Sequence, residues 1–180
     1  MKNDAMLYHA SPQSGLKTLV PHESTHGKEY VYALNNRFTA LLFGAPSDDF
    51  DLLVDESAGR TVIYECYPGA LKAIYSGKTC SVYEVGEDGF LAGQTGWDAE
   101  LVCEHSVPVS AEERIEDLYD EITSAIQSGA CIFHPYSNEP DYQSHLREEL
   151  LSRIHIFGIT GAQMDADPRF RHYSSELLAR

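Results

Sequence analysis

Short segments rich in β-branched and aromatic residues recur along the chain, each bounded by turn-forming residues. Helical patterns between them are few and isolated, so the regular strand and helix alternation of a parallel sheet is missing. Neither a Walker loop nor a glycine-rich dinucleotide fingerprint is present. The pattern predicts an α+β fold with a largely antiparallel sheet and a few short helices. Its predicted strands cover residues 5–10, 30–34, 61–67, 79–85, 101–109 and 130–134.

A short apolar helix is predicted over residues 37–44. Asn35 and Asn36 offer oxygens that can cap its N-terminus, and Gly44 is a stop signal. The residues that follow, 47–59, are acidic and polar. We therefore expect them to form a solvated loop.

The clearest helix signal begins at Ser110. Ser110 and Glu113 have the spacing of a capping box, and Gly129 stands where a left-handed C-terminal residue belongs. A helix is therefore predicted from Ser110 to Gly129, and a further helical segment over residues 142–155. The apolar face of the first of these helices consists of Ile115, Leu118, Tyr119, Ile122 and Ile126.

Length and charge restrict the possible partners. The chain has 180 residues, with 13 Lys and Arg against 28 Asp and Glu, and therefore a formal charge of −15. A chain of this length is expected to form one domain, residues 1–180, with a substantial core. Its acidity argues against general nucleic-acid binding, which needs clustered cations to neutralise phosphates.

Two further absences in the sequence bear on location. The longest apolar runs are far shorter than the roughly 20 residues that span a bilayer, and the N-terminus has no apolar signal segment. The four cysteines are too widely spaced for a zinc knuckle or a redox pair. We expect a cytoplasmic protein with reduced cysteines and no membrane partner.

Three polar side chains lie where a core strand would not select them. His9 lies at the end of the first predicted strand, Tyr32 lies in the second, and Glu100 precedes Leu101 after a glycine-rich loop. Taken singly, each has an ordinary explanation: a structural histidine, a core tyrosine and a solvated carboxylate. Only their occurrence together, in this order, favours a functional interpretation.

The motifs around two of these residues resemble those of the ADP-ribosyltransferase-like superfamily. The resemblance is to its histidine-tyrosine-glutamate branch, to which diphtheria toxin and the poly-ADP-ribose polymerases belong, and it covers residues 7–109. His9-Ala10-Ser11 is similar to the first motif of that branch, although Ala10 replaces the commoner glycine. Glu100, followed by an apolar strand, resembles the third motif.

The second motif is similar as well. Tyr32 is followed by the short helical pattern and then, 11 positions later, by Phe43. This spacing resembles that of the two aromatic residues that sandwich nicotinamide in the family, although Phe43 replaces the commoner tyrosine.

The resemblance implies a fold and an activity. It implies a single ADP-ribosyltransferase-like domain with a split antiparallel sheet, in which residues 7–109 form the core and residues 110–180 an extension. The implied activity is NAD-dependent ADP-ribosyl transfer to an unidentified acceptor, such as a protein, or NAD hydrolysis. NAD is then a substrate, and no metal is required.

The resemblance also assigns roles to individual residues. Glu100 would stabilise the oxocarbenium-like transition state of glycosidic cleavage and hold the ribose 2′-hydroxyl. His9 would bind the adenosine ribose, and the backbone of Ala10 would pair with the nicotinamide carboxamide. Tyr32 and Phe43 would stack on the pyridinium ring. The implied catalytic residues are Glu100, His9 and Tyr32, and the implied NAD-binding residues are His9, Ala10, Ser11, Tyr32 and Phe43.

Other interpretations remain open at this point. A catalytically inactive member could bind a nucleotide or a protein through the same cleft, because a fold does not imply a function. Alternatively, the chain is an acidic interaction protein that uses the helix from Ser110 or the acidic loop. Asp98, two residues before Glu100, gives a weak indication of an arginine acceptor. His22 and His26 have no second ligand pair at a suitable spacing, so no metal site is predicted.

Overall fold

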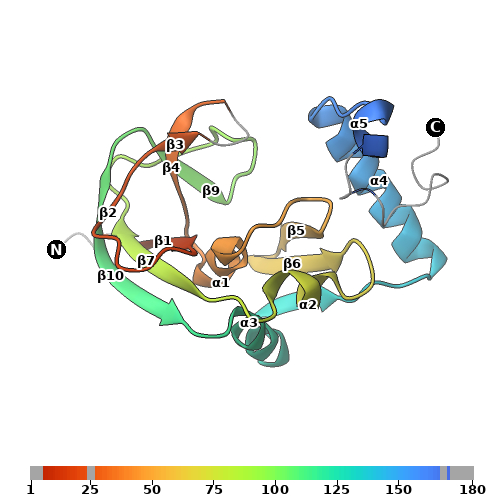
Figure 1. Cartoon of the computed structure of the whole chain (residues 1–180), viewed down its shortest axis with the longest axis horizontal. Coiled ribbons are helices and arrows are strands. Elements are labelled where there is room, and N and C mark those ends of the chain that lie inside the picture. The colour runs from red at the N-terminus through yellow and green to blue at the C-terminus, as the bar shows by residue number, and fades with distance from the viewer. Residues whose placement is uncertain (1–5, 24–26, 167–169, 171–180) are drawn as a thin grey trace. The chain divides into compact units, whose positions relative to one another are not determined.

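The computed structural model describes residues 6–23, 27–166 and 170, which form two compact units. The first unit combines the described residues up to Pro46 with Tyr75–Ala130, and the second combines Ser47–Ile74 with the described residues from Cys131 onward. The predicted α+β class with a largely antiparallel sheet is confirmed (Figure 1). Ala5 and residues 167–169 and 171–180, parts of the predicted first strand and of the tail, lie outside the described residues.

The first unit is built on an eight-stranded sheet. Its strands follow the order β2-β10-β7-β1-β4-β9-β8, with β3 paired to β4, and neighbours are antiparallel. The strands are β1 (Met6–Ser11), β2 (Thr18–Leu19), β3 (His22–Glu23), β4 (Glu29–Leu34), β7 (Cys80–Gly86), β8 (Leu91–Ala92), β9 (Glu100–Cys103) and β10 (Val107–Ile115).

The predicted helix over residues 37–44 is confirmed as α1 (Arg37–Leu41) continued by the 3₁₀ helix η1 (Leu42–Gly44). Asn36 caps it: its side-chain oxygen accepts hydrogen bonds from the backbone N–H groups of Phe38 and Thr39 at 2.9 and 3.2 Å. These bonds satisfy two of the N–H groups that a helix leaves unpaired at its start.

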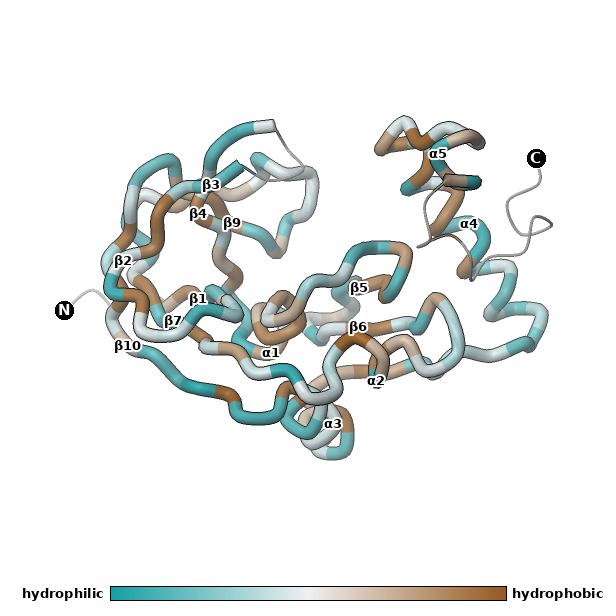
Figure 2. Tube along the Cα trace, viewed as in Figure 1, coloured by the Kyte–Doolittle hydropathy of each residue, from teal (hydrophilic) through white to brown (hydrophobic). Residues whose placement is uncertain are grey.

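The predicted helix start at Ser110 is wrong. Residues 110–115 continue β10, which pairs with β7 from Val109 opposite Val85 to Ile115 opposite Cys80. Helix α3 (Leu118–Gln127) begins later and is capped by Asp117. The backbone hydrogen bonds between β10 and β7 outweigh the local capping signal. The second half of β10 is rich in hydrophilic residues (Figure 2).

The predicted strand over residues 101–109 is also corrected. The chain forms two strands there, β9 and β10, which are separated by residues 104–106. Strand β9 pairs with β4 and β8, whereas β10 pairs with β7 and β2. The polar residues 104–106 interrupt the apolar pattern at the point where the chain changes its neighbours.

The second unit contains a three-stranded sheet in the order β11-β6-β5. Strand β5 (Leu52–Ser57) is antiparallel to β6 (Arg60–Glu65), and β11 (Cys131–His134) is parallel to β6. Leu146, Leu150 and Ile154 of α4 are buried in the same cluster as Leu53 of β5. The helices named from this part of the chain are α2 (Ala70–Tyr75), α4 (Pro140–Ile156) and α5 (Gly161–Ala166).

The predicted acidic loop over residues 47–59 is wrong for its second half. Leu52 and Leu53 are buried and begin β5, while Asp55 and Glu56 occupy its exposed end. The burial of Leu52 and Leu53 and the pairing with β6 extend the strand into the acidic residues that follow.

None of the helices in the described residues is long and apolar enough to cross a membrane.

Candidate functional site

The three candidate polar residues lie on three adjacent strands of the first unit. His9 is on β1, Tyr32 on β4 and Glu100 on β9, and β4 pairs with both of the other strands. In one row across these strands, Leu34 lies opposite Tyr8 on one side and opposite Glu100 on the other. Because paired strands lie about 5 Å apart, β1 and β9 are separated by about 10 Å.

Strand register assigns these residues to two faces of the sheet. Directly opposed residues share a face, so Tyr8, Leu34 and Glu100 share one. Tyr32, two residues before Leu34, belongs to that same face, which we call the Glu100 face. His9 follows Tyr8 directly and therefore belongs to the other, the His9 face. The sheet thus brings the three residues close together but not onto one surface.

A hydrogen bond links His9 to the strand that carries Tyr32. The Nδ1 atom of His9 lies 2.7 Å from the carbonyl oxygen of Tyr32. A carbonyl oxygen only accepts, so Nδ1 carries the proton, and Nε2 of the neutral ring is an acceptor. Burial lowers the pKa of His9, the bond to Tyr32 opposes this shift, and the nearby His22 adds to it. The lowered pKa favours the neutral form of the His9 ring.

A pocket of about 300 Å³ lies beside His9. Among the described residues, β1 and β4 are paired at one position only, Tyr8 with Leu34. The ring of His22, which also lines the pocket, contacts the ring of Tyr32 edge-on at 5.6 Å. Apolar walls with a few polar groups suit a small molecule. The lining residues are His9, Ser11, Gln13, Leu16, Thr18, Leu19, Val20, His22 and Val31.

Residues 12–17 form a loop along one side of this pocket, which we call the pocket loop. Tyr83 of β7 forms hydrogen bonds with the backbone of this loop. The hydroxyl of Tyr83 donates to the carbonyl oxygen of Gln13 at 2.7 Å and accepts from the N–H of Leu16 at 3.3 Å. The Tyr83 side chain is fully buried. Gln13 and Leu16 both line the pocket, so Tyr83 fixes their backbone.

Glu112 of β10 also forms a hydrogen bond with the pocket loop. Its Oε1 atom accepts from the backbone N–H of Gly15 and from the hydroxyl of Ser81, both at 2.8 Å. These hydrogen bonds lower the pKa of Glu112. Sequence reasoning did not single out Tyr83 or Glu112, because their role depends on a register that no local pattern reveals.

On the other face, Glu100 is half-buried and follows a turn that begins at Trp97. The Glu100 N–H donates to the Trp97 carbonyl oxygen at 3.1 Å. Trp97 packs against the cluster of Leu34, Ala40 and Ala99. It was not among the predicted site residues, although the only tryptophan of the chain, three positions before Glu100, was a signal.

Phe43 is exposed, although the residues on both sides of it are not. Its exposed fraction is 47 %, whereas Leu42 and Gly44 are buried. Its ring lies 6.0 Å from that of Trp97, while Tyr32 packs against His22 and, at 5.9 Å, Tyr30. The two aromatic residues of the second motif therefore have different surroundings.

The two remaining predicted site residues, Ser11 and Ala10, belong to opposite faces of the sheet. Ser11 lines the pocket. Ala10 is buried and lies opposite Val82, on the Glu100 face.

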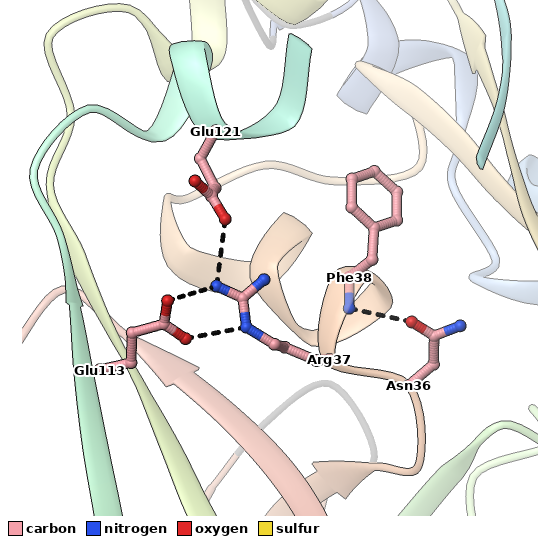
Figure 3. Close-up of polar contacts among 5 residues, drawn as sticks. All are labelled: Asn36, Arg37, Phe38, Glu113 and Glu121. Carbon is pink, nitrogen blue, oxygen red and sulfur yellow. Dashed lines mark hydrogen bonds and ion pairs between the residues drawn. The ribbon is translucent and has the colours of Figure 1, made fainter. Parts of the chain in front are cut away.

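Arg37, the first residue of α1, holds this helix to two other elements (Figure 3). Its Nε and Nη2 atoms each lie 2.8 Å from an oxygen of Glu113 on β10, and Nη2 lies 3.1 Å from Glu121 Oε1 on α3. Such a two-point contact fixes orientation as well as distance. At the other end, the hydroxyl of Tyr75 donates to the carbonyl oxygen of Leu42 at 2.7 Å. Phe43 thus lies in a segment that is held by the ion pairs of Arg37 at its start and by the Tyr75 hydrogen bond near its end.

Among residues 6–23, 27–166 and 170, no group of three or more His, Cys, Asp and Glu side chains is arranged to hold a metal ion. His26, considered above with His22, lies outside these residues. Comparisons of the chain with known protein families, with curated proteins and with solved structures found no match.

Proposed function

We propose that the protein cleaves the bond between nicotinamide and ribose in NAD and transfers ADP-ribose to an acceptor or to water. The observation that carries this proposal is the position of His9, Tyr32 and Glu100 on adjacent strands β1, β4 and β9. These residues are far apart in the sequence, and their order and neighbours already resemble the three motifs of ADP-ribosyltransferases.

The proposed chemistry assigns the reacting bond to Glu100. The bond between ribose C1′ and the pyridinium nitrogen breaks, and its electron pair leaves with nicotinamide. The positive charge that develops on the ribose is stabilised by the nearby carboxylate of Glu100. The acceptor then forms a bond to C1′ and loses a proton to Glu100 or to solvent, so that charge and atoms balance.

The proposed position of the adenosine end follows from the protonation of His9. Its Nε2 atom is an acceptor, so a ligand group at this point must donate a hydrogen bond, as a ribose hydroxyl does. The adjoining pocket of about 300 Å³ can take part of a nucleoside. The proposal requires NAD to extend from this pocket, past the pair of Tyr8 with Leu34, to Glu100 on the other face.

The nicotinamide end is proposed to lie against Phe43. A half-exposed aromatic ring between buried neighbours presents a flat surface to a ligand. The ring is fastened beside Trp97, whose carbonyl oxygen holds the backbone of Glu100. A pyridinium ring on this surface gains from the negative faces of the aromatic rings.

Nicotinamide release from NAD, measured by mass spectrometry, tests the proposal. The variants are Glu100→Gln and, as a matched control, Glu104→Gln, which changes an exposed glutamate just beyond the other end of β9. Release should fall by about 100-fold or more in Glu100→Gln, as expected for a lost transition-state charge. It should be unchanged in Glu104→Gln. Absence of release from folded wild-type protein, or unchanged release in Glu100→Gln, would overturn the proposal.

The same assay with added cell lysate distinguishes the two fates of ADP-ribose. An increase in the rate with lysate, together with ADP-ribose attached to a lysate component, identifies a transferase. Equal rates, with free ADP-ribose as the product, identify a glycohydrolase.

A second candidate function is nucleotide binding without turnover. The observation in its favour is that His9 and Glu100 belong to opposite faces of the sheet. Calorimetric binding of NAD to the wild type, without nicotinamide release over hours, would select this candidate instead.

A further inference from the structure

Two consecutive glutamates of β10 hold structures on opposite faces of the sheet. Glu112 binds the pocket loop through Gly15, and Glu113 binds α1 through Arg37. This division follows from strand geometry, because successive side chains of a strand point to opposite faces. One strand therefore holds both the pocket loop and the start of α1.

On the His9 face, Glu112 belongs to a row of three residues. Glu112 lies opposite Tyr83, and Tyr83 lies opposite His9. The Glu112 carboxylate is 3.3 Å from the Tyr83 hydroxyl, and the Tyr83 ring is 6.4 Å from the ring of His9. Glu112 is thus connected to the pocket both through the loop and through Tyr83, whose ring neighbours His9.

On the other face, Glu113 acts through Arg37. Both carboxylate oxygens of Glu113 accept hydrogen bonds from the Arg37 guanidinium. Arg37 begins α1, and α1 continues directly into η1, which presents Phe43. A change in the position of Arg37 therefore moves the start of the segment that carries the exposed ring.

We propose that Glu112 and Glu113 are positioning residues for the two ends of NAD: Glu112 for the adenosine end in the His9 pocket, Glu113 for the nicotinamide end at Phe43. This inference rests on the proposed function. Because the adenosine end takes no part in the reaction, Glu112 should affect binding. Because the nicotinamide end carries the reacting bond, Glu113 should affect the rate of cleavage.

The two glutamates provide each other's control, since the same substitution can be made at adjacent positions. In Glu112→Gln, KM for NAD and the dissociation constant of ADP-ribose should rise by about tenfold, the size expected for a lost charged acceptor, with little change in kcat. In Glu113→Gln, kcat should fall by about tenfold, as expected for a reacting bond that is no longer well oriented, while ADP-ribose binding stays within about twofold of wild type. Glu104→Gln serves as a surface control for both.

Two readouts are independent of turnover. ADP-ribose binding is measured by calorimetry on the full chain. The indole N–H resonance of Trp97, the only tryptophan, reports the neighbouring Phe43 ring. This resonance should shift in Glu113→Gln and stay in place in Glu112→Gln.

A conservative variant separates positioning from folding. Arg37→Lys keeps the charge but not the two-point contact, so it should lower kcat less than Glu113→Gln does, and circular dichroism should match the wild type. If Glu113→Gln does not fold, Arg37→Lys with an altered Trp97 resonance and an unaltered ADP-ribose affinity still supports the inference.

The inference is overturned if both glutamine variants change KM, kcat and the Trp97 resonance alike, or if neither changes any of them. Failure of the proposed function has a different signature. In that case the wild type releases no nicotinamide, while the Trp97 resonance still responds to Glu113→Gln.

Discussion

The pocket loop and the α1–η1 segment (residues 36–44) are both short, yet different forces hold them. The pocket loop is held by hydrogen bonds from Tyr83 and Glu112 to its backbone. The α1–η1 segment is held mainly by buried side chains and a close approach at Gly44, with a partly exposed ion pair at Arg37. The loop should therefore respond to lost hydrogen bonds, and the segment to steric change.

The largest effect is expected from a steric change in the α1–η1 segment. A Cβ atom at Gly44 would lie 2.6 Å from the Cys80 Sγ atom and 2.9 Å from its Cβ atom. Gly44→Ala should lower the free energy of unfolding by about 2–3 kcal/mol, as overpacking of a core does. Urea unfolding measures this loss. In the double variant with Cys80→Ala, part of it should be recovered, and a full additive loss would contradict the steric explanation.

A smaller loss is expected when a hydrogen bond of the pocket loop is removed. Tyr83→Phe keeps the buried ring but removes the hydroxyl that binds Gln13 and Leu16. The free energy of unfolding should fall by about 1 kcal/mol, because two partly buried backbone groups lose their hydrogen-bond partner. The Leu16 amide should also exchange its hydrogen faster. Unchanged exchange at Leu16 would show that Tyr83 does not hold the loop.

A loss of stability toward acid pH, smaller than the two effects above, is expected from His9. Its ordinary pKa is 6.5, and burial lowers the pKa in the folded chain. As pH falls below 6.5, the unfolded chain binds the proton first, so stability is lost as pH decreases. Urea unfolding should show a stability difference between about pH 7.5 and 5.5 that shrinks in His9→Gln. The exposed His105→Gln is the control, and an equal reduction there would refute the assignment.

The smallest effect is expected from the ion pair of Arg37. Because the Arg37 and Glu113 side chains are 33 % and 55 % exposed, water screens the pair. Arg37→Gln should cost about 0.5–1 kcal/mol of stability and less at high salt, as for partly exposed networks. Arg114→Gln, which breaks the more exposed pair with Glu116, should cost still less. A larger loss in Arg114→Gln would contradict this ranking.

Local sequence patterns located those elements whose position in the chain can be predicted without knowing which strands they pair with. The strand with His9, the strand with Tyr32 and the helix capped by Asn36 all lie where the sequence placed them, within a few residues. The capping-box signal at Ser110 failed because Glu113 binds Arg37 instead, and the backbone there belongs to a ladder with β7. Long-range pairing decided between two locally acceptable structures.

The candidate site was predicted less completely than the fold. Residue types, their order and the resemblance to three motifs selected His9, Tyr32 and Glu100 as candidates. These features could not show that His9 belongs to a different face from the other two, because a register shift of one residue exchanges the faces of a strand. The sequence also placed Glu112 and Glu113 in the first turn of a predicted helix, whereas in the structure they lie on a strand and make contacts on opposite faces of the sheet.

A crystal structure of Glu100→Gln with NAD tests most directly whether one ligand uses both faces of the sheet. The account predicts a ribose hydroxyl at Nε2 of His9, the adenosine end in the adjoining pocket, the nicotinamide ring against Phe43 and the bond to C1′ beside residue 100. NAD bound wholly on one face, or away from His9, would contradict it.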